Sequence, residues 1–457
     1  MSTENLTHLI SKYDARVPRY TSYPTAADFI TFDDSRIAQD AIRAGIRVGS
    51  SKPVSLYIHL PFCASLCWFC ACNKVVAHDQ SVVEPYLEAL NREIALVSDV
   101  AGGRISLGQV HLGGGSPTFL SSHHMETLFS SLRSQFDGFE TASKSIELDP
   151  RTTTPEQLAV LAAAGFTRAS IGVQDFNEVV QRAVHRVQPK ELVQQVVDQV
   201  REAGFKSVNF DLIYGLPQQT EHSMRETISD VLTLRPDRIA LYGYAHVQWK
   251  VKVQRALEKF TLPTAEERVA LFSLAEEELL THGYVSLGLD HFALPSDELV
   301  AHAEARTLHR TFMGYTTVEG EGVLGLGVSA ISDIGNTLYQ NEVDLGNYYN
   351  MLVAGKLPVV RGRVRTADDT VRAYIIERIM CDGELVVDEA PLAVREGVEA
   401  AVEEALPRLR LLERDDLLRA HPGKLVATFN GRFFLRTIAS VFDAHLAHTT
   451  AGYSQAV

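Results

Sequence analysis

The sequence predicts an α/β fold: a partial (β/α) barrel, preceded by an N-terminal arm and followed by a mostly helical C-terminal domain. Two observations predict the barrel. Short apolar runs typical of strands alternate with longer segments of helical periodicity over the first half of the chain. Several helical segments end at a glycine just before the next run, as at Gly165 and Gly204. Such alternation implies parallel strands joined by helical crossovers.

Six strand–helix units are expected in the barrel. The strands are expected at 54–60, 110–113, 145–149, 169–173, 207–214 and 239–244, and the helices at 82–100, 125–136, 155–164, 190–203 and 223–234. In a (β/α) barrel the chemistry lies at the C-terminal ends of the strands. Functional residues are therefore expected at or just past the end of each run.

The chain divides into three parts on sequence character. Residues 1–48 form the arm, which carries the polar and aromatic patch PRYTSYPT at 18–25. Residues 49–365 form the barrel core. Residues 366–457 form the C-terminal domain, because the sequence there becomes charged and helical at 368–380 and 394–406.

Composition narrows the class of protein. The chain has 457 residues, of which 46% are hydrophobic, so a sizeable core can form without disulfides. Its net charge of −14 argues against a nucleic-acid partner, because phosphate binding needs a cationic surface. Neither a signal-peptide pattern nor an apolar run of membrane-spanning length is found, so a cytoplasmic location without a membrane span is expected.

Four of the five cysteines crowd into one loop after the first strand. Cys63, Cys67 and Cys70 are separated by three and then two residues, and Cys72 follows. Disulfides are rare in the cytoplasm, so this crowding indicates metal or redox chemistry. Three thiolates at this spacing favour an iron–sulfur cluster with one open iron. A structural zinc site, or a redox pair of Cys67 and Cys70, remains an alternative.

The cysteine loop and a set of longer motifs resemble one known family. Cys-x-x-x-Cys-x-x-Cys at the end of a first barrel strand is the signature of the radical S-adenosylmethionine enzymes. The chain is more specifically similar to the oxygen-independent coproporphyrinogen III oxidases (coproporphyrinogen III dehydrogenases). The motifs that carry this similarity are PRYTSYPTA at 18–26, YIHLPFCASLCWFCACNK at 57–74, HLGGGSPTFL at 111–120, SIELDPR at 145–151, IGVQDFN at 171–177, NFDLIYGLPQQT at 209–220, RPDRIALYGYAH at 235–246, LGLGVSAIS at 324–332 and GRFFLR at 431–436.

The resemblance implies an oxidoreductase of haem (porphyrin) biosynthesis. A [4Fe-4S] cluster and S-adenosyl-L-methionine, two molecules of it per active site, are the implied cofactors. A 5′-deoxyadenosyl radical would take hydrogen from two propionate side chains of coproporphyrinogen III, each of which would lose carbon dioxide and become a vinyl group in protoporphyrinogen IX. An electron donor and an acceptor, both unidentified, and a monomeric state are also implied.

The resemblance assigns residues to this chemistry. Cys63, Cys67 and Cys70 match the cluster ligands, and Cys72 matches an extra family cysteine of open role. Tyr57 matches a tyrosine beside the cluster-bound S-adenosylmethionine and is the candidate catalytic residue. The other cofactor-binding positions that match are Phe69, Gly114, Gly115, Ser116, Glu147, Gln174, Arg186, Asp211, Ala245 and Ile331.

Several of these residues also have ordinary structural readings. Tyr57 alone would be a core aromatic, and Glu147 would be a structural carboxylate, for instance one paired with Arg151. Of the cofactor contacts, Gly114 is implied for the first S-adenosylmethionine, and Gly115 with Ser116 for the second.

One position departs from the family pattern. Met313 stands where family members often have glutamine, which removes an amide near the expected substrate side. Arg19, Arg310 and Lys250 are available to bind the substrate's carboxylates. Two other functions compete with the oxidase: a haem chaperone of the same superfamily, and another radical enzyme acting on a tetrapyrrole.

Overall fold

The six expected strands lie side by side as a parallel array in the computed structural model, which describes residues 3–34, 36–46, 48–49, 52–318, 322–446 and 452–454. They are β2 (Val54–Leu60), β5 (Ile105–Gly114), β7 (Ser143–Leu148), β8 (Arg168–Gln174), β9 (Ser207–Tyr214) and β10 (Arg238–Gly243). A seventh strand, β15 (Gly322–Leu326), pairs in parallel with the free edge of β2. The sequence did not lead us to expect it.

Antiparallel strands extend the array on both sides. Beyond β15 follow β16 (Ile331–Ile334), β17 (Thr337–Asn341), β18 (Val359–Val364) and β1 (Ile30–Thr31), and beyond β10 follow β12 (His291–Ala293) and β11 (Val285–Leu287). Among the described residues the path of pairing has two ends, β1 and β11. The barrel is therefore partial, as the sequence predicts.

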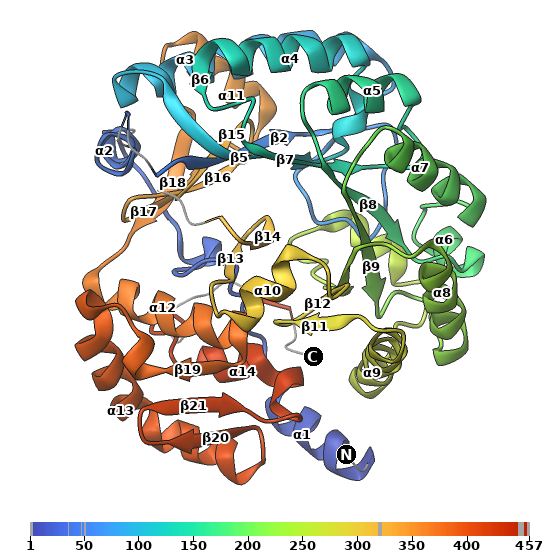
Figure 1. Ribbon diagram of the computed structural model, residues 1–457, viewed down its shortest axis with the longest axis vertical. Coiled ribbons are helices and arrows are strands. Elements are labelled where there is room, and N and C mark those ends of the chain that lie inside the picture. The colour runs from blue at the N-terminus through green and yellow to red at the C-terminus, as the bar shows by residue number, and fades with distance from the viewer. Residues whose placement is uncertain are drawn as a thin grey trace.

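Helices cover the outer side of the array, as Figure 1 shows along its upper and right-hand edges. They are α3 (Val83–Ala101), α4 (Ser122–Gln135), α5 (Pro155–Ala163), α6 (Glu178–Ala183), α7 (Lys190–Glu202), α8 (Glu221–Leu234) and α9 (Ala265–Thr281). Local sequence sets their ends: the side chains of Thr154 and Thr220 cap α5 and α8, and Gly102 ends α3 in the left-handed conformation.

Strands β7, β8 and β9 alternate between two environments. Ile146, Ile171 and Phe210 are fully buried in the core under the outer helices. The residues between them are polar and face the hollow of the barrel, because successive strand side chains point to opposite faces. This alternation places the polar side chains of three strands around one interior space.

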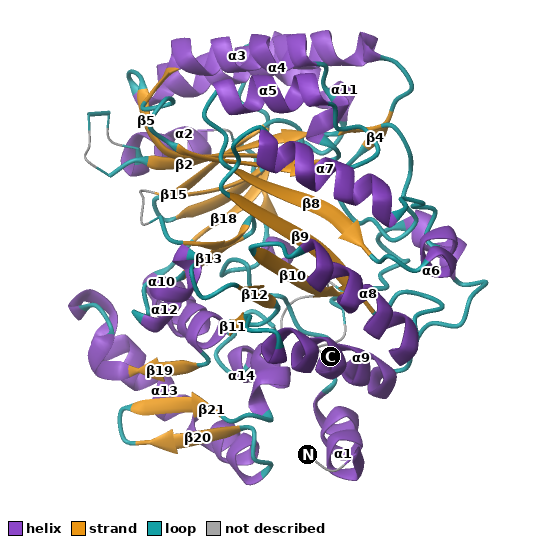
Figure 2. Cartoon of the chain, turned by 45° about the vertical axis from the view of Figure 1, so that its right-hand side comes forward, coloured by secondary structure: helices purple, strands orange, loops and turns teal. Residues whose placement is uncertain are grey.

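A hairpin and a helix lie within that hollow. The hairpin pairs β13 (His309–Thr311) with β14 (Gly314–Thr316), and α10 (Glu298–Glu304) precedes it. Both lie between the barrel strands and the C-terminal domain in Figures 1 and 2. The turn of the hairpin consists of Phe312 and Met313, so it carries these two side chains toward the barrel interior.

The C-terminal part has its own hydrophobic core. It contains α12 (Ala367–Asp382), α13 (Leu392–Arg414) and α14 (Leu435–Ser440), and a three-stranded sheet of β19 (Glu384–Val386), β20 (Leu418–His421) and β21 (Lys424–Ala427). The sequence predicted α12 and α13 but neither α14 nor the sheet. The remaining short elements are β3 (Phe62–Cys63), β4 (Val75–Val76), β6 (Phe136–Asp137) and α11 (Leu345–Val353).

The N-terminal arm divides between the two cores. Leu9, Ile10, Val17, Tyr20 and Tyr23 belong to the C-terminal core, in line with the position of α1 (Thr3–Tyr13) beside that domain in Figure 1. Hydrogen bonds fasten this contact: the Tyr20 hydroxyl donates to Asp443 at 2.9 Å, and Arg436 donates to the Pro18 carbonyl at 3.0 Å. In contrast, α2 (Arg36–Gly45) packs on the barrel core.

No helix among the described residues is long and apolar enough to span a lipid bilayer.

Candidate functional site

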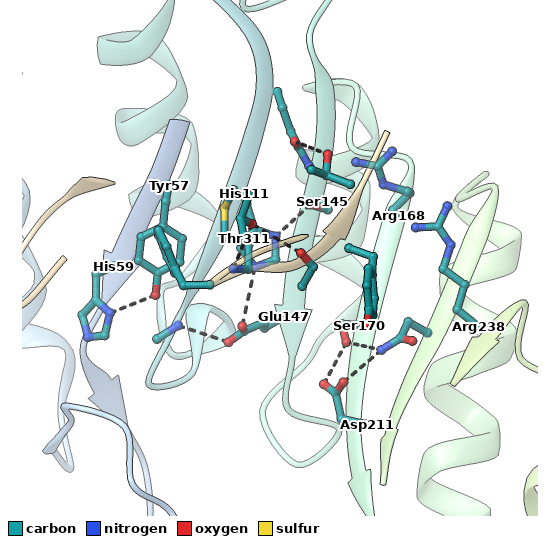
Figure 3. Close-up of a pocket in the computed structure, with 18 of the residues that line it drawn as sticks. Tyr57, His59, His111, Ser145, Glu147, Arg168, Ser170, Asp211, Arg238 and Thr311 are labelled. Atoms are coloured by element: carbon teal, nitrogen blue, oxygen red, sulfur yellow. Dashed lines mark hydrogen bonds and ion pairs between the residues drawn. The ribbon is translucent and has the colours of Figure 1, made fainter. Parts of the chain in front are cut away.

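A polar cavity of about 420 Å³ occupies the hollow of the barrel. Its walls come from β2, β5, β7, β8 and β9 and from the turn of the hairpin, as Figure 3 shows. The inward positions of three strands supply seven of the polar lining residues: Ser145, Glu147, Arg168, Ser170, Ser207, Asn209 and Asp211. The two-residue period of the strands therefore builds this cavity directly from the sequence.

Tyr57 and His59 form a hydrogen-bonded pair on β2. The Tyr57 hydroxyl lies 3.0 Å from His59 Nδ1, and His59 Nε2 lies 2.9 Å from the Asn73 carbonyl. A carbonyl only accepts, so Nε2 carries the proton and Tyr57 donates to Nδ1. Burial lowers the pKa of His59 and raises that of Tyr57, which keeps both neutral. The Tyr57 hydroxyl is thus fixed in direction at the cavity wall (Figure 3).

Glu147 bridges two neighbouring strands. Its Oε2 accepts a hydrogen bond from the Gly114 amide at 3.1 Å, and its Oε1 lies 3.5 Å from His111 Nε2. Gly114 has φ +116°, and a Cβ there would lie 2.7 Å from the His59 ring. The pairing of Glu147 with Arg151 does not occur, because Arg151 binds Asp149 instead, at 2.6 Å.

Asp211 lies on the far side of the cavity, on β9. It accepts hydrogen bonds from Ser170 Oγ at 2.8 Å and Asn209 Nδ2 at 3.0 Å. Burial, together with the charge of Glu147, raises the pKa of Asp211 to about 7. The cavity therefore holds two carboxylates, Glu147 and Asp211, and both are able to accept hydrogen bonds from ligand hydroxyl groups.

The cysteine loop is tied to the barrel at both of its sides. The Gly115 and Ser116 amides donate to the Leu60 and Phe62 carbonyls at 2.8 and 2.9 Å. A Cβ on Gly115 would lie 2.6 Å from the backbone of Pro61, so this close approach needs glycine. On the other side, the Trp68 amide donates to the Val184 carbonyl at 3.0 Å.

The sulfur atoms lie in unequal surroundings. A hydrogen bond from the Cys72 thiol lowers the pKa of Cys70 to about 6, whereas burial raises that of Cys63 to about 12. Two guanidinium groups face Cys67: Arg186 Nη1 lies 3.6 Å and Arg151 Nη2 3.7 Å from its sulfur. Asp149 accepts from both arginines and holds them in place.

The loop fits an iron–sulfur cluster by its donors. Cys63, Cys67 and Cys70 are free thiols, and two fixed cations face the middle one. In the described part of the chain, no three His, Cys, Asp or Glu side chains converge on a point that a single metal ion could occupy. A cluster presents a different iron to each thiolate, so its ligands need not converge in this way.

A buried glutamine that the sequence did not single out connects the loop to the strand end after β10. Gln254 is fully buried, and its Nε2 donates to the Phe69 carbonyl at 2.9 Å and to the Ala245 carbonyl at 3.1 Å. Its Oε1 accepts from the Val247 amide at 2.7 Å. Two of the predicted positions, Phe69 and Ala245, are therefore held together by this one side chain.

The predicted residues fall into two neighbouring groups. Tyr57, Gly114, Glu147, Asp211 and Ile331 line the polar cavity. The other predicted residues do not line this cavity: Phe69, Gly115, Ser116, Gln174, Arg186 and Ala245. Cys72 lines the cavity and lies in the loop, so it joins the two groups. Ser116 Oγ is buried without a hydrogen-bond partner among the described residues, which leaves it available to a ligand.

Sequence reasoning missed several polar residues of the site, among them His59, His111, Gln109 and Gln254. Three of them occupy inward positions of β2 and β5, where Tyr57 and His59, and Gln109 and His111, follow a two-residue period within apolar runs. That period is the signal that could have found them. Gln254 lies in a short helical turn and has no such pattern.

A larger cavity of about 830 Å³ adjoins the polar one. The two share Thr311, Phe312 and Ile331 as lining residues. The larger one lies between the arm, the hairpin and α12, and all three cations considered from the sequence, Arg19, Lys250 and Arg310, line it. Met313, the departure from the family pattern, lines the polar cavity only.

Comparisons with known proteins agree with this site. Residues 57–231 match the model of the radical SAM superfamily. The chain is 39% identical to an oxygen-independent coproporphyrinogen III oxidase of Bradyrhizobium diazoefficiens, over 98% of this chain and 99% of the relative, and 39% identical to that of Escherichia coli, over 96% and 95%. A solved coproporphyrinogen III oxidase from Escherichia coli, described as a radical SAM enzyme, superposes with a TM-score of 0.86 at 36% identity, covering 94% of this chain and 100% of that one. The chain therefore belongs to the oxygen-independent coproporphyrinogen III oxidase family of the radical SAM superfamily.

Proposed function

We propose that this chain converts coproporphyrinogen III to protoporphyrinogen IX without oxygen, by oxidative decarboxylation of two propionate side chains to vinyl groups. The observation that carries the proposal is the similarity to oxidases of this name over nearly the whole chain. In each round a hydrogen atom leaves the β-carbon of a propionate, carbon dioxide leaves, and one electron passes to an acceptor.

Cys63, Cys67 and Cys70 are the proposed cluster ligands. A reduced [4Fe-4S] cluster and S-adenosylmethionine together supply the carbon-centred radical that takes the hydrogen atom. The protein's own part is electrostatic: Arg151 and Arg186 place positive charge against the Cys67 sulfur. The donor that reduces the cluster and the acceptor remain to be identified.

Tyr57, Gly114, Glu147 and Ile331 are the proposed surroundings of the first S-adenosylmethionine, with Tyr57 the residue nearest the chemistry. Their common place on the wall of the polar cavity supports the assignment. Glu147 offers a carboxylate oxygen to ribose hydroxyls. The Tyr57 hydroxyl is already engaged with His59, so its ring is held rigidly against the ligand.

We assign to a second S-adenosylmethionine Asp211, which lines the polar cavity, and six residues that do not line it: Phe69, Gly115, Ser116, Gln174, Arg186 and Ala245. The unpartnered Ser116 hydroxyl and the cationic Arg186 support a polar ligand on this side of the loop. We also propose that residues 49–365 form the catalytic unit, that 1–48 and 366–457 frame it, and that the protein acts as a cytoplasmic monomer.

The test is anaerobic reconstitution with iron and sulfide, followed by reduction and addition of S-adenosylmethionine and coproporphyrinogen III. Protoporphyrinogen IX and 5′-deoxyadenosine, read by mass spectrometry, should both appear, and both should be absent with Cys67→Ser. Deoxyadenosine without a decarboxylated porphyrin would reject the substrate and favour another radical enzyme. A full cluster with neither product would favour a haem chaperone.

A further inference from the structure

Arg310 is a buried cation with unused hydrogen-bonding capacity. Its side chain lies on β13, is 4% exposed, and faces the larger cavity. Neither Nε nor Nη1 has a hydrogen-bond partner among the described residues. Buried guanidinium groups normally satisfy their donors, because an unsatisfied buried donor is costly. A ligand that brings an acceptor to this place would remove that cost.

The carboxylates nearest to Arg310 are committed to other groups. Asp290 lies 3.6 Å from Arg310 Nη1, beyond hydrogen-bond range, and accepts from His291 at 2.7 Å. Glu377 accepts from the Arg310 backbone amide at 3.3 Å and lies 3.2 Å from His309. The face of the guanidinium covers the ring of Tyr315 at 4.7 Å, which fixes its orientation.

The other described arginines of this cavity donate hydrogen bonds, whereas Nε and Nη1 of Arg310 donate none and Nη1 has only the ion pair with Asp290 at 3.6 Å. Arg365 forms a two-point ion pair with Asp333, at 2.5 and 2.6 Å. Arg361 donates to Gln340 at 2.7 Å, and Arg19 donates to the Gly243 carbonyl at 2.7 Å. Arg310 is thus the wall cation whose hydrogen-bond donors are best prepared for an incoming carboxylate.

The position of Arg310 relative to the polar cavity decides which carboxylate it would bind. Phe312 separates the two cavities and packs edge-on against Tyr57, with ring centroids 4.9 Å apart. Arg310 precedes Phe312 by two residues on the hairpin and lines the larger cavity only. A side chain that reacts must extend past Phe312 toward Tyr57, so a carboxylate held at Arg310 belongs to a different arm of the same molecule.

We propose that the larger cavity binds the tetrapyrrole ring and that Arg310 binds the carboxylate of a propionate that is not being decarboxylated. This inference rests on the proposed function and adds to it the binding site of the substrate. The volume of about 830 Å³ lies in the range of cavities that enclose ligands of this size. A planar guanidinium suits the task, since it offers a carboxylate two parallel donors.

The test compares Arg310→Gln with the control Arg372→Gln, which changes a largely buried arginine that is bonded to Asp368 and Glu404 and lines neither cavity. Binding of coproporphyrin III, the oxidised form of the substrate with its four carboxylates, is measured by fluorescence with the reconstituted protein. Its tetramethyl ester, which has no carboxylate, is the reference ligand. Arg310→Gln should weaken binding of the acid roughly 10- to 100-fold and leave the ester unchanged. Arg372→Gln should affect neither by more than about twofold.

Each other outcome has a definite meaning. Equal binding of the acid by wild type and Arg310→Gln overturns the assignment, and so does an equal loss for acid and ester, which indicates a packing defect. If Arg310→Gln does not fold, Arg310→Lys is tested, because it keeps the positive charge and lacks the two parallel donors of the guanidinium. Arg310→Lys should show an intermediate loss of binding for the acid only. Binding of the acid by Arg310→Lys at the wild-type level overturns the assignment. If wild type binds no coproporphyrin III yet cleaves S-adenosylmethionine, the proposed function fails and this inference fails with it. If wild type converts the substrate and Arg310→Gln does so equally well, this inference alone is rejected.

Discussion

Gln254 provides a direct test of how the cysteine loop is held. Its amide bonds three backbone groups, the carbonyls of Phe69 and Ala245 and the amide of Val247, inside a fully buried site. Gln254→Leu keeps the approximate volume and removes all three bonds. At about 1 kcal/mol for each bond, the free energy of unfolding should fall by about 3 kcal/mol.

Gln157 is a matched control because it is built in the same way. It is buried, donates to the Thr118 and Leu120 carbonyls at 2.9 and 2.6 Å, and accepts from the Thr154 amide at 2.8 Å. Gln157→Leu should therefore lose a similar free energy of unfolding, measured by urea denaturation of the apoprotein. Its bonds hold segments that carry no cysteine.

The distinguishing measurement is the rate at which a chelator removes iron from the reconstituted proteins. We expect faster removal from Gln254→Leu than from wild type, and an unchanged rate for Gln157→Leu. The reasoning is wrong if both variants release iron at the same rate, or if Gln254→Leu loses less than about 1 kcal/mol of stability.

Three further predictions follow from the site. Because burial raises the pKa of Asp211 to about 7, the folded protein keeps a proton that the unfolded chain loses near pH 4. The free energy of unfolding of the apoprotein should therefore fall by up to about 4 kcal/mol as pH rises from about 4 through 7. Asp211→Asn should reduce this pH dependence in urea titrations, and an unchanged pH dependence would contradict the prediction. Gly115→Ala should push the cysteine loop away from β5 and lower the iron content after reconstitution, because its Cβ would clash with the Pro61 backbone. Gly346→Ala, at an exposed position of α11, should leave the iron content unchanged. Equal iron content in both variants would refute the predicted clash. Tyr57→Phe should cost about 1 kcal/mol of stability, since His59 loses its donor, and no change in urea denaturation would mean that the bond contributes nothing.

Local sequence patterns predicted the barrel well, for a physical reason. Each strand of the array buries one face under helices, so apolar residues recur in short runs and the crossovers show helical periodicity. Strand β15 was not predicted, because its sequence, GVLGL, is rich in glycine and is typical of a turn. In the structure glycine allows a close backbone contact here, since a Cβ on Gly325 would lie 2.2 Å from the Ile331 carbonyl oxygen.

The site was predictable only in part. The cysteine spacing and Tyr57 stand in one continuous motif, so the sequence displays them together. The larger cavity has no such motif, because its walls combine residues near 20, 250, 310, 365 and 453 that only the fold brings together. Which arginine of that cavity is left without hydrogen-bond partners depends on these distant contacts, and composition carries no trace of it.

The packing of the arm against the C-terminal domain has a consequence for folding during translation. Tyr20 and its partner Asp443 are 423 positions apart. At roughly 5 to 20 residues per second, a ribosome delivers the partner roughly 20 to 85 s after the arm. Strand β10 ends at Gly243, so β2 to β10 are complete only in about the second half of that interval, while Leu9, Ile10 and Tyr23 still lack the rest of the C-terminal core. The nascent chain therefore passes through a stage in which the cysteine loop has been synthesised and the wall that α12 gives to the larger cavity has not.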